Sequence, residues 1–326
     1  MGIKGFSKAF TPSVIKMKDL KNLRGSFDAS VILYQSALGM NSINGLTDSS
    51  GAPTLHINVI ISRILNFIDN NTGQVWVFDY YEKGYTPPNK ELEISKRNAR
   101  KEKAKIKIDE LKSKSSDDLF SSDDETETKI NQQEKIAFSV NDQIINDCIF
   151  ILNCFDITWC ISPKGVEAEQ VCAELTNLNC DFVYSTDVDA LLYGAKKLVR
   201  SVNIKGKKIL QSYELNNILE TNSIDMASLS KISVILGSDH AEKTAGVGPK
   251  TVLKKYKNIT LSEEQTKALD VFKKPIDITS INFNNKDSAP LSNGDKIKEL
   301  LDWLESRNFN RDRIKKQISK VHSFTE

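Results

Sequence analysis

The chain has few of the residues that build the commonest metal and disulfide sites. Its five cysteines include no C-x-x-C pair, and their number is odd. Its three histidines, His56, His240 and His322, are far apart in sequence and share no ligand spacing. We therefore expect reduced thiols in an intracellular protein, with zinc or disulfides as the minor alternatives. A His-rich zinc site or a histidine-based nucleophile has little support.

Long apolar runs are also missing. No stretch approaches the ~18 residues that span a bilayer, and the start MGIKGFSKAF has no signal-peptide core, so neither a membrane protein nor secretion is expected. Charge is nearly balanced, with 45 Lys+Arg against 43 Asp+Glu in 326 residues. With 39% hydrophobic residues, the composition is that of a soluble globular protein with one large domain or two smaller ones.

The charges are unevenly distributed along the chain. Ten basic and five acidic residues lie between residues 90 and 114, whereas residues 115–128 (SSDDLFSSDDETET) carry six acids and no base. The basic stretch predicts either a solvated helix or a helix that faces phosphate. The acidic stretch is predicted to be a flexible, low-complexity linker.

The spacing of apolar residues alternates along the chain between that typical of strands and that typical of helices. Strands are predicted at 74–79, 156–162 and 180–187, a helix at 167–178, and two short strands joined by a Gly206 turn at 198–210. Helices then follow at 226–236, 249–256, 262–272, 294–304 and 311–321, with a turn-rich segment at 275–290. Alternation of this kind predicts an α/β fold with a mostly parallel central sheet flanked by helices.

Seven acids fall where such a sheet binds ligands, at strand ends and helix starts or after an apolar helix. They are Asp28, Asp79, Glu167, Glu169, Asp187, Asp189 and Asp239. Clustered carboxylates raise each other's pKa or require a hard cation, and an all-oxygen set favours magnesium or manganese over zinc. Two such ions about 3.5–4 Å apart support phosphodiester hydrolysis. Each acid taken alone is better explained as a helix cap or an exposed turn, and it is the joint placement of the acids that points to a site.

A second candidate motif, GVGPKT at 246–251, precedes a helix predicted to contain KKYK. It is not a Walker A loop, because the spacing G-x-x-x-x-G-K-[ST] is not satisfied. Two glycines and a proline before a helix allow backbone N–H groups to approach a phosphate. A purely structural turn is an equal alternative.

Taken in order, these motifs resemble the XPG-type structure-specific 5′ nuclease family, and in particular its flap endonucleases, from Met1 to about Val321. The matching segments are MGIKG, FDASVILYQ, VWVFD, PPNKELEISKR, GVEAEQVCAEL, YSTDVDALLYG, ILGSDH and GVGPK. The resemblance implies a PIN-like 5′ nuclease fold with a helical arch and a helix-two-turn-helix. We expect an amino-terminal nuclease region at 1–105, an arch with an acidic linker at 106–136, an internal nuclease region with the helix-two-turn-helix at 137–257, and a helical region packed on the core at 258–326.

The resemblance also implies roles for particular residues. The seven acids would bind two Mg²⁺ ions, for which Mn²⁺ can substitute. The amino group of Gly2, exposed by removal of Met1, would lie near the cleft, Tyr34 would stack on the base beside the scissile bond, and Lys90 and Arg97 would steer the scissile phosphate. The expected DNA-backbone contacts are Arg100, Lys101, Gly246, Val247, Gly248 and Lys250, with K⁺ at the helix-two-turn-helix.

The function expected from this resemblance is a magnesium-dependent 5′ flap endonuclease with 5′→3′ exonuclease activity. It would act as a monomer on branched DNA in replication or repair, in the nucleus or at a cytoplasmic or viral replication site. The Asn-, Lys- and Ile-rich composition is compatible with an AT-rich, viral genome. Alternatives are an exonuclease at nicks and ends, a Holliday junction resolvase and a non-catalytic junction binder. A small acidic-cluster RNase would not need GVGPK.

The chain departs from the family pattern at three places. The acidic stretch stands where the family has the cap over the arch, and His240 replaces a usual aromatic residue. No sliding-clamp motif is expected, because Lys320 and Ser323 occupy its decisive positions.

Overall fold

The computed structural model describes residues 2–38, 54–82, 85, 91–117, 124–284 and 294–321. The chain forms two compact units, each assembled from three segments. The first unit comprises Met1–Val31, Asn70–Lys90 and Thr158–Asn285, and the second comprises Ile32–Asp69, Glu91–Ile157 and Lys286–Glu326. This division differs from the four consecutive ranges expected from the sequence, because each unit joins segments that are distant along the chain.

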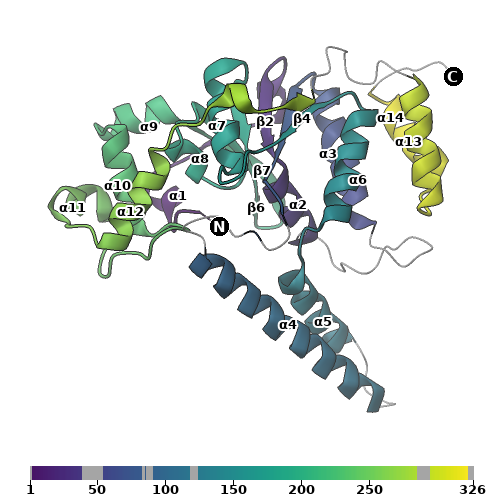
Figure 1. The fold of residues 1–326 in the computed structure, drawn as a ribbon, viewed down its shortest axis with the longest axis horizontal. Coiled ribbons are helices and arrows are strands. Elements are labelled where there is room, and N and C mark those ends of the chain that lie inside the picture. Colours follow the sequence, from purple (N-terminus) through teal and green to yellow (C-terminus); the bar gives the residue numbers. More distant parts are fainter. Residues whose placement is uncertain are drawn as a thin grey trace. The chain divides into compact units, whose positions relative to one another are not determined.

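An eight-stranded sheet forms the centre of the first unit, in the order β1-β7-β6-β5-β2-β3-β4-β8 (Figure 1). The inner strands from β6 to β4 pair in parallel, whereas β1, β7 and β8 pair antiparallel at the edges. The strands are β1 (Ser13–Ile15), β2 (Arg24–Asp28), β3 (Gly73–Phe78), β4 (Thr158–Ile161), β5 (Phe182–Tyr184), β6 (Lys197–Ile204), β7 (Lys207–Glu214) and β8 (Phe283–Asn284). The parallel centre is confirmed. The segment predicted to be turn-rich at 275–290 also contains β8, a strand too short to give a periodic signal.

Helices of the first unit pack on this sheet around one apolar core. Val75 and Val77 of β3 and Val171 of α7 are fully buried in it. Local capping sets several helix starts: Asp225 accepts a hydrogen bond from Ser228 N, and Ser262 forms a capping box with Gln265. The helices are α1 (Phe6–Ala9), η1 (Met17–Leu20), α7 (Ala168–Leu178), α8 (Asp189–Leu192), α9 (Leu215–Asn222), α10 (Met226–Leu236), α11 (Val252–Lys255), η2 (Tyr256–Asn258), α12 (Glu263–Phe272) and η3 (Ile278–Ser280).

The second unit is helical in its described residues. Its helices are α3 (Leu55–Asp69), α4 (Glu91–Asp117), α5 (Asp124–Ala137), α6 (Asp142–Cys154), α13 (Gly294–Ser306) and α14 (Arg311–Ser319), and α2 (Ala29–Leu38) crosses the division between the units. Helices α4 and α5 lie side by side as a hairpin (Figure 1), with Ala104 and Ile108 of α4 buried.

The prediction of a flexible linker at 115–127 is wrong where the structure describes it. Residues 115–117 end α4 and residues 124–127 begin α5, while 118–123 lie outside the described residues. Acidic residues at the amino end of a helix interact favourably with its dipole, and Glu125 pairs with Lys129 one turn later at 3.3 Å. The acidic composition therefore supports a helix start here.

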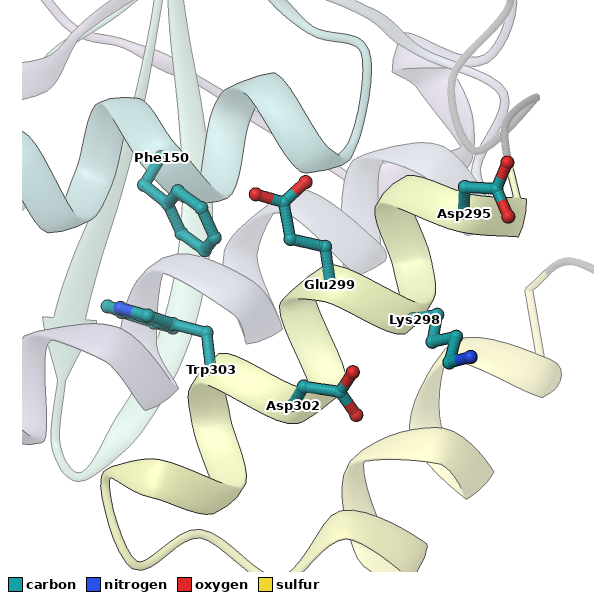
Figure 2. A pocket seen from close by; sticks show the side chains of 6 residues that line it. All are labelled: Phe150, Asp295, Lys298, Glu299, Asp302 and Trp303. Atoms are coloured by element: carbon teal, nitrogen blue, oxygen red, sulfur yellow. The ribbon is translucent and has the colours of Figure 1, made fainter.

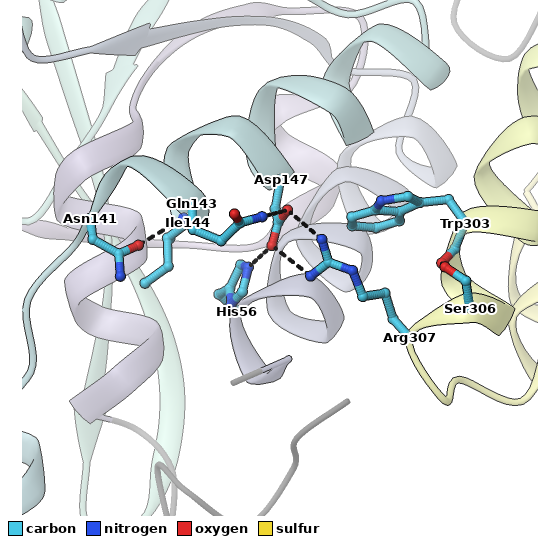
Figure 3. Close-up of polar contacts among 8 residues, drawn as sticks. All are labelled: His56, Asn141, Gln143, Ile144, Asp147, Trp303, Ser306 and Arg307. Atoms are coloured by element: carbon cyan, nitrogen blue, oxygen red, sulfur yellow. Dashed lines mark hydrogen bonds and ion pairs between the residues drawn. The ribbon is translucent and has the colours of Figure 1, made fainter. Parts of the chain in front are cut away.

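A buried ionic network joins α3, α6 and the end of α13 (Figure 3). The Asp147 carboxylate, 3% exposed, lies 2.9 Å from His56 Nε2 and accepts a hydrogen bond from Gln143 Nε2 at 2.7 Å. The Arg307 guanidinium lies 3.3 Å from Asp147 Oδ1 and 4.9 Å from the centre of the Trp303 ring. Because an isolated buried charge is strongly unfavourable, these partners hold the three helices together.

All five cysteines are buried free thiols, namely Cys148, Cys154, Cys160, Cys172 and Cys180. Burial raises the pKa of the Cys160 thiol to about 12 and that of Cys180 to about 11. Protonated thiols are poor nucleophiles and poor metal ligands, so burial favours a structural role for these cysteines. No helix among the described residues is long and apolar enough to cross a membrane.

Candidate active site

Five of the seven acids stand at the carboxyl ends of the inner strands or just beyond them. Asp28 ends β2, Asp79 follows β3, and Asp187 and Asp189 follow β5. Glu167 precedes α7 in the connection from β4. Because β5, β2, β3 and β4 are consecutive parallel neighbours, their carboxyl ends share one edge of the sheet. Topology therefore brings acids from distant parts of the sequence to this edge.

Hydrogen bonds through Ser185 connect the acids that follow β2 and β5. The Ser185 hydroxyl donates to Asp28 Oδ2 at 3.1 Å and accepts from Asp187 N at 3.0 Å. Asp187 Oδ1 in turn accepts from Asp189 N at 3.1 Å. Sequence analysis missed Ser185. Its position two residues before the first Asp of STDVD is the signal that could have found it.

Gly2 joins the same group from the amino terminus. Its backbone N donates to Asp239 Oδ2 at 3.3 Å, which ties the loop after α10 to the start of the chain. A Cβ at this position would stand 2.2 Å from Asp187 Oδ1, and Gly2 has φ +78°. Only glycine fits here without strain. The structure thus brings Gly2, Asp187 and Asp239 close together.

The remaining acids meet at the start of α7. Asp79 Oδ1 accepts a hydrogen bond from Ala168 N at 2.9 Å, and Ala168 lies between Glu167 and Glu169 in the chain. The His240 side chain, 2% exposed, has Nε2 3.8 Å from Glu167 Oε1. His240, noted in the sequence only as a departure from the family, is therefore a neighbour of this carboxylate.

The electrostatics of this edge are strongly negative. Burial, followed by repulsion from Asp79, raises the pKa of Asp28 to about 8. The Tyr193 hydroxyl is buried and has no hydrogen-bond partner among the residues that the structure describes. Its pKa is raised far above the usual value by burial and then by nearby carboxylates, Glu167 foremost. A cation placed here would relieve the repulsion and favour the ionised carboxylates.

The chemistry of the donor set fits a hard divalent cation. All seven side chains offer carboxylate oxygens, the ligands that Mg²⁺ and Mn²⁺ prefer. Within the described part of the chain, no three His, Cys, Asp or Glu side chains are already placed to hold a metal ion together. Several of these carboxylates accept hydrogen bonds from backbone N–H groups, among them Asp79 from Ala168 and Asp187 from Asp189.

The second unit brings together two of the other predicted residues, Tyr34 and Lys101. The Lys101 ammonium lies 5.8 Å from the centre of the Tyr34 ring and donates to Ser139 Oγ at 2.7 Å. Phe138 packs edge-on against Tyr34, with ring centres 5.9 Å apart. Partial burial, followed by repulsion from Arg97, lowers the pKa of Lys101.

Of the two predicted gateway residues, the structure describes Arg97, which lies on α4. Arg97 is half-buried on this helix, and Arg100 is exposed and donates from Nε to Lys96 O at 3.3 Å. Lys90 lies outside the described residues. The basic stretch is therefore helical, as predicted.

The GVGPK segment forms a tight loop before a short helical turn. Gly246 has φ +72°, and Gly248 N donates to Thr251 Oγ1 at 3.2 Å, so this amide is occupied within the loop. Val247 is half-buried and Lys250 is exposed. The predicted helix at 249–256 is reduced to α11 and the 3-10 turn η2. Gly5 packs against this loop: a Cβ there would stand 2.3 Å from Pro249 Cγ.

A cavity of about 490 Å³ lies in the second unit (Figure 2). Its lining comprises Phe150, Asp295, Lys298, Glu299, Asp302 and Trp303. Asp302 is already paired with Arg311, and the Trp303 ring is packed against Phe150, with ring centres 4.8 Å apart. Asp302, Trp303 and Phe150 are therefore already engaged in contacts of the second unit.

Comparison with known proteins identifies the family. The XPG N-terminal domain matches residues 1–104, and the XPG I-region matches residues 156–239. The chain is 27% identical to flap endonuclease 1 of Sulfolobus acidocaldarius over 96% of its own length and 88% of the relative's. It is also 27% identical to flap endonuclease 1 of Saccharomyces cerevisiae, covering 98% of this chain and 87% of that protein.

Solved structures show the same fold. Flap endonuclease-1 from Methanococcus jannaschii superposes with a TM-score of 0.68 at 22% identity, covering 97% of this chain and 96% of that one. The catalytic core of Rad2 in complex with DNA substrate gives a TM-score of 0.66 at 18% identity, covering 98% and 100%. The chain therefore belongs to the XPG family of metal-dependent, structure-specific nucleases. The relatives it matches along most of their length are flap endonucleases.

Proposed function

We propose that this chain hydrolyses DNA phosphodiesters as a structure-specific 5′ flap endonuclease with accompanying 5′→3′ exonuclease activity. One observation carries the proposal: the seven family acids occur in family order, and contacts of the first unit join Asp28, Asp187 and Asp239 through Ser185 and Gly2. A structural sheet would not collect buried carboxylates without a cation to neutralise them. Replication and repair are the processes in which such DNA structures arise.

The seven acids are proposed to hold two Mg²⁺ ions, for which Mn²⁺ can substitute. Asp28, Asp79, Glu167 and Glu169 would mainly serve one ion, and Glu169, Asp187, Asp189 and Asp239 the other. When bound, the ions supply Lewis-acid stabilisation to the phosphodiester oxygens. The fit follows from the all-oxygen donors and from the raised pKa of Asp28.

The chain's other residues bind and orient the DNA in this proposal. The Gly2 amino group stays beside Asp239, Tyr34 stacks on a base, and Lys90 and Arg97 orient the scissile phosphate. The proposed backbone contacts are Arg100, Lys101, Gly246, Val247, Gly248 and Lys250, with K⁺ at the helix-two-turn-helix. Phosphate contacts carry no sequence information, so selectivity is for DNA shape. Branched DNA is the proposed substrate, and a monomer with no sliding-clamp tether is the proposed acting form.

Cleavage of end-labelled DNA tests the proposal. Double-flap, nicked, blunt and four-way-junction substrates are incubated with Mg²⁺, with EDTA as the control. We expect one dominant cut at the base of the 5′ flap. Preference for nicks and ends would instead indicate an exonuclease, and preference for the four-way junction would indicate a Holliday junction resolvase. Tight junction binding without any metal-dependent cut would leave a non-catalytic binder.

A further inference from the structure

Two loops that carry proposed metal ligands are fastened together near the active site. One loop follows β3 and begins with Asp79, and the other runs from β4 to Glu167. At their base, Ser162 N donates to Phe78 O at 2.8 Å, and Tyr80 N donates to Ser162 Oγ at 2.9 Å. The two loops, which follow the neighbouring parallel strands β3 and β4, are therefore in contact with each other where they begin.

Farther out, Lys164 of the second loop contacts three side chains of the first. Its ammonium lies 2.6 Å from Glu82 Oε2, 4.7 Å from the centre of the Tyr85 ring and 5.7 Å from that of Tyr80. The Tyr80 hydroxyl donates to the same Glu82 oxygen at 2.9 Å. Cation–π contacts add to the ion pair, so Lys164 has several attractive partners on one loop.

The tyrosines complete a closed set of contacts. The Tyr80 and Tyr85 rings pack edge-on at 5.4 Å, and Tyr85 N donates to Glu82 O at 2.9 Å. The Tyr85 hydroxyl stands 3.6 Å from where a Cβ of Gly165 would lie. We call Tyr80, Glu82, Tyr85 and Lys164 the loop clamp. Its side chains are too exposed for a core role, since those of Lys164 and Glu82 are 54% and 49% exposed.

We propose that Lys164 is a positioning residue for the metal site: by holding the loop after β3 to the loop after β4, it fixes Asp79 relative to Glu167 and Glu169. The hydrogen bond from Ala168 N to Asp79 Oδ1 joins the same two loops at the ligands themselves. The clamp is a second tie, which limits the separation of the two loops when the carboxylates bind an ion. This inference rests on the proposed function, because it assigns these acids to a metal site.

A direct phosphate contact is the competing role for an exposed lysine beside a nuclease site. The Lys164 ammonium is directed at Glu82, so its charge is neutralised within the clamp. If Lys164 binds phosphate, removal of the Glu82 charge should strengthen DNA binding. If Lys164 positions the loops, removal of Glu82 should weaken metal binding. The two roles therefore predict opposite effects for one substitution.

The test compares Lys164→Met, Glu82→Gln and Lys164→Arg with the control Lys267→Met. Lys267 pairs with Glu263 at 2.7 Å on α12, an exposed ion pair of similar length that touches no proposed ligand. Mn²⁺ affinity is measured by calorimetry in the absence of DNA. Affinity for flap DNA is measured in EDTA, and the Mg²⁺ concentration that gives half-maximal cleavage is determined in parallel.

We expect Lys164→Met and Glu82→Gln each to weaken Mn²⁺ binding about tenfold. This is the lower end of the about 10- to 100-fold loss of metal affinity that follows when a residue supporting a metal ligand is removed. A further variant that combines Lys164→Met with Glu82→Gln should bind Mn²⁺ no worse than either single variant. Lys164→Arg and the control Lys267→Met should stay near wild type, and flap affinity should not change. Mn²⁺ affinity unaltered in Lys164→Met would overturn the inference. So would weaker flap binding in Lys164→Met with wild-type or tighter binding in Glu82→Gln. Altered Mn²⁺ binding in a chain that cleaves no DNA would contradict the nuclease proposal alone.

Discussion

At the scale of single residues, the active-site edge depends on groups that sequence spacing describes poorly. The seven acids were predicted because each has a marked position at a strand end or helix start. Ser185 and Tyr193 were not, because a serine or tyrosine near an apolar segment is ordinary in any fold. The importance of Ser185 appears only when Asp28 and Asp187, 159 positions apart by number, meet at its hydroxyl.

Asp187→Asn should abolish most Mg²⁺-dependent cleavage, by about a hundredfold or more, since losing a ligand should cost at least as much as losing its supporting partner. The amide oxygen can still accept from Asp189 N, so folding and junction binding should persist. Single-turnover cleavage and thermal unfolding check both points. Asp270→Asn, at an exposed acid of α12, is the matched control. Wild-type cleavage by Asp187→Asn would contradict the site assignment.

Gly5→Ala should destabilise the first unit by about 1–3 kcal/mol, because residue 5 has φ +74° and a Cβ would overlap Pro249. Gly248→Ala is the control: it has open space around its Cβ and no positive φ, so its change should stay within about 0.5 kcal/mol. Urea unfolding of both variants measures the difference. Equal effects would show that the packing of Gly5 on Pro249 is unimportant.

At the scale of elements, strongly periodic segments were predicted well and short ones were not. The helix predicted at 226–236 is found at those bounds as α10, whose start is fixed by the Asp225 cap. By contrast, the acidic segment was taken for a linker because composition was weighed above helix propensity. The parallel strands β3 and β5 were predictable, since their apolar runs end near acids, and β4 was predictable from its apolar run, whereas β2 was not predicted. The edge strands β1 and β8 were not, because pairing with distant neighbours defines them.

Asp147→Asn should destabilise the second unit by about 3–5 kcal/mol, because it leaves the Arg307 guanidinium without its buried counter-charge. Asp142→Asn, at an exposed acid in the first turn of the same helix, should lower stability by less than about 1 kcal/mol. The unfolding of both variants in denaturant is followed by the circular dichroism of their helices, and the two denaturation midpoints are compared. Matching midpoints would contradict the structural role of the network.

Arg97→Glu should slow single-turnover cleavage about tenfold or more while weakening flap affinity by no more than about threefold, because the proposed contact is to the reacting phosphate. Lys103→Glu reverses the same charge at an exposed position of α4 and should alter both quantities only slightly. Rapid-quench kinetics and binding titrations separate the two quantities. Parallel losses of rate and affinity in Arg97→Glu would identify a simple phosphate tether.

At the scale of the whole molecule, function follows from how distant segments are assembled. The first unit gathers acids from three separate stretches of chain, and the second presents the basic helix α4. Local patterns predicted both chemistries, but they could not predict which segments share a unit. Contacts such as that of Asp147 with Arg307 join residues that lie far apart in the sequence, so local periodicity cannot predict them. The clamp around Lys164 likewise needs two loops that only the pairing of β3 with β4 brings together.

The most direct test of metal-dependent nuclease activity is the response of one double-flap substrate to Mg²⁺. The purified chain is treated with EDTA, and cleavage of a 5′-labelled flap is followed as Mg²⁺ is returned. We predict no product in EDTA and a single cut at the flap base that rises to saturation with Mg²⁺, with Mn²⁺ able to replace it. Cleavage that persists in excess EDTA, or the absence of any cut at saturating Mg²⁺ with the flap bound, would contradict the assignment of the acidic edge as a metal-dependent catalytic site.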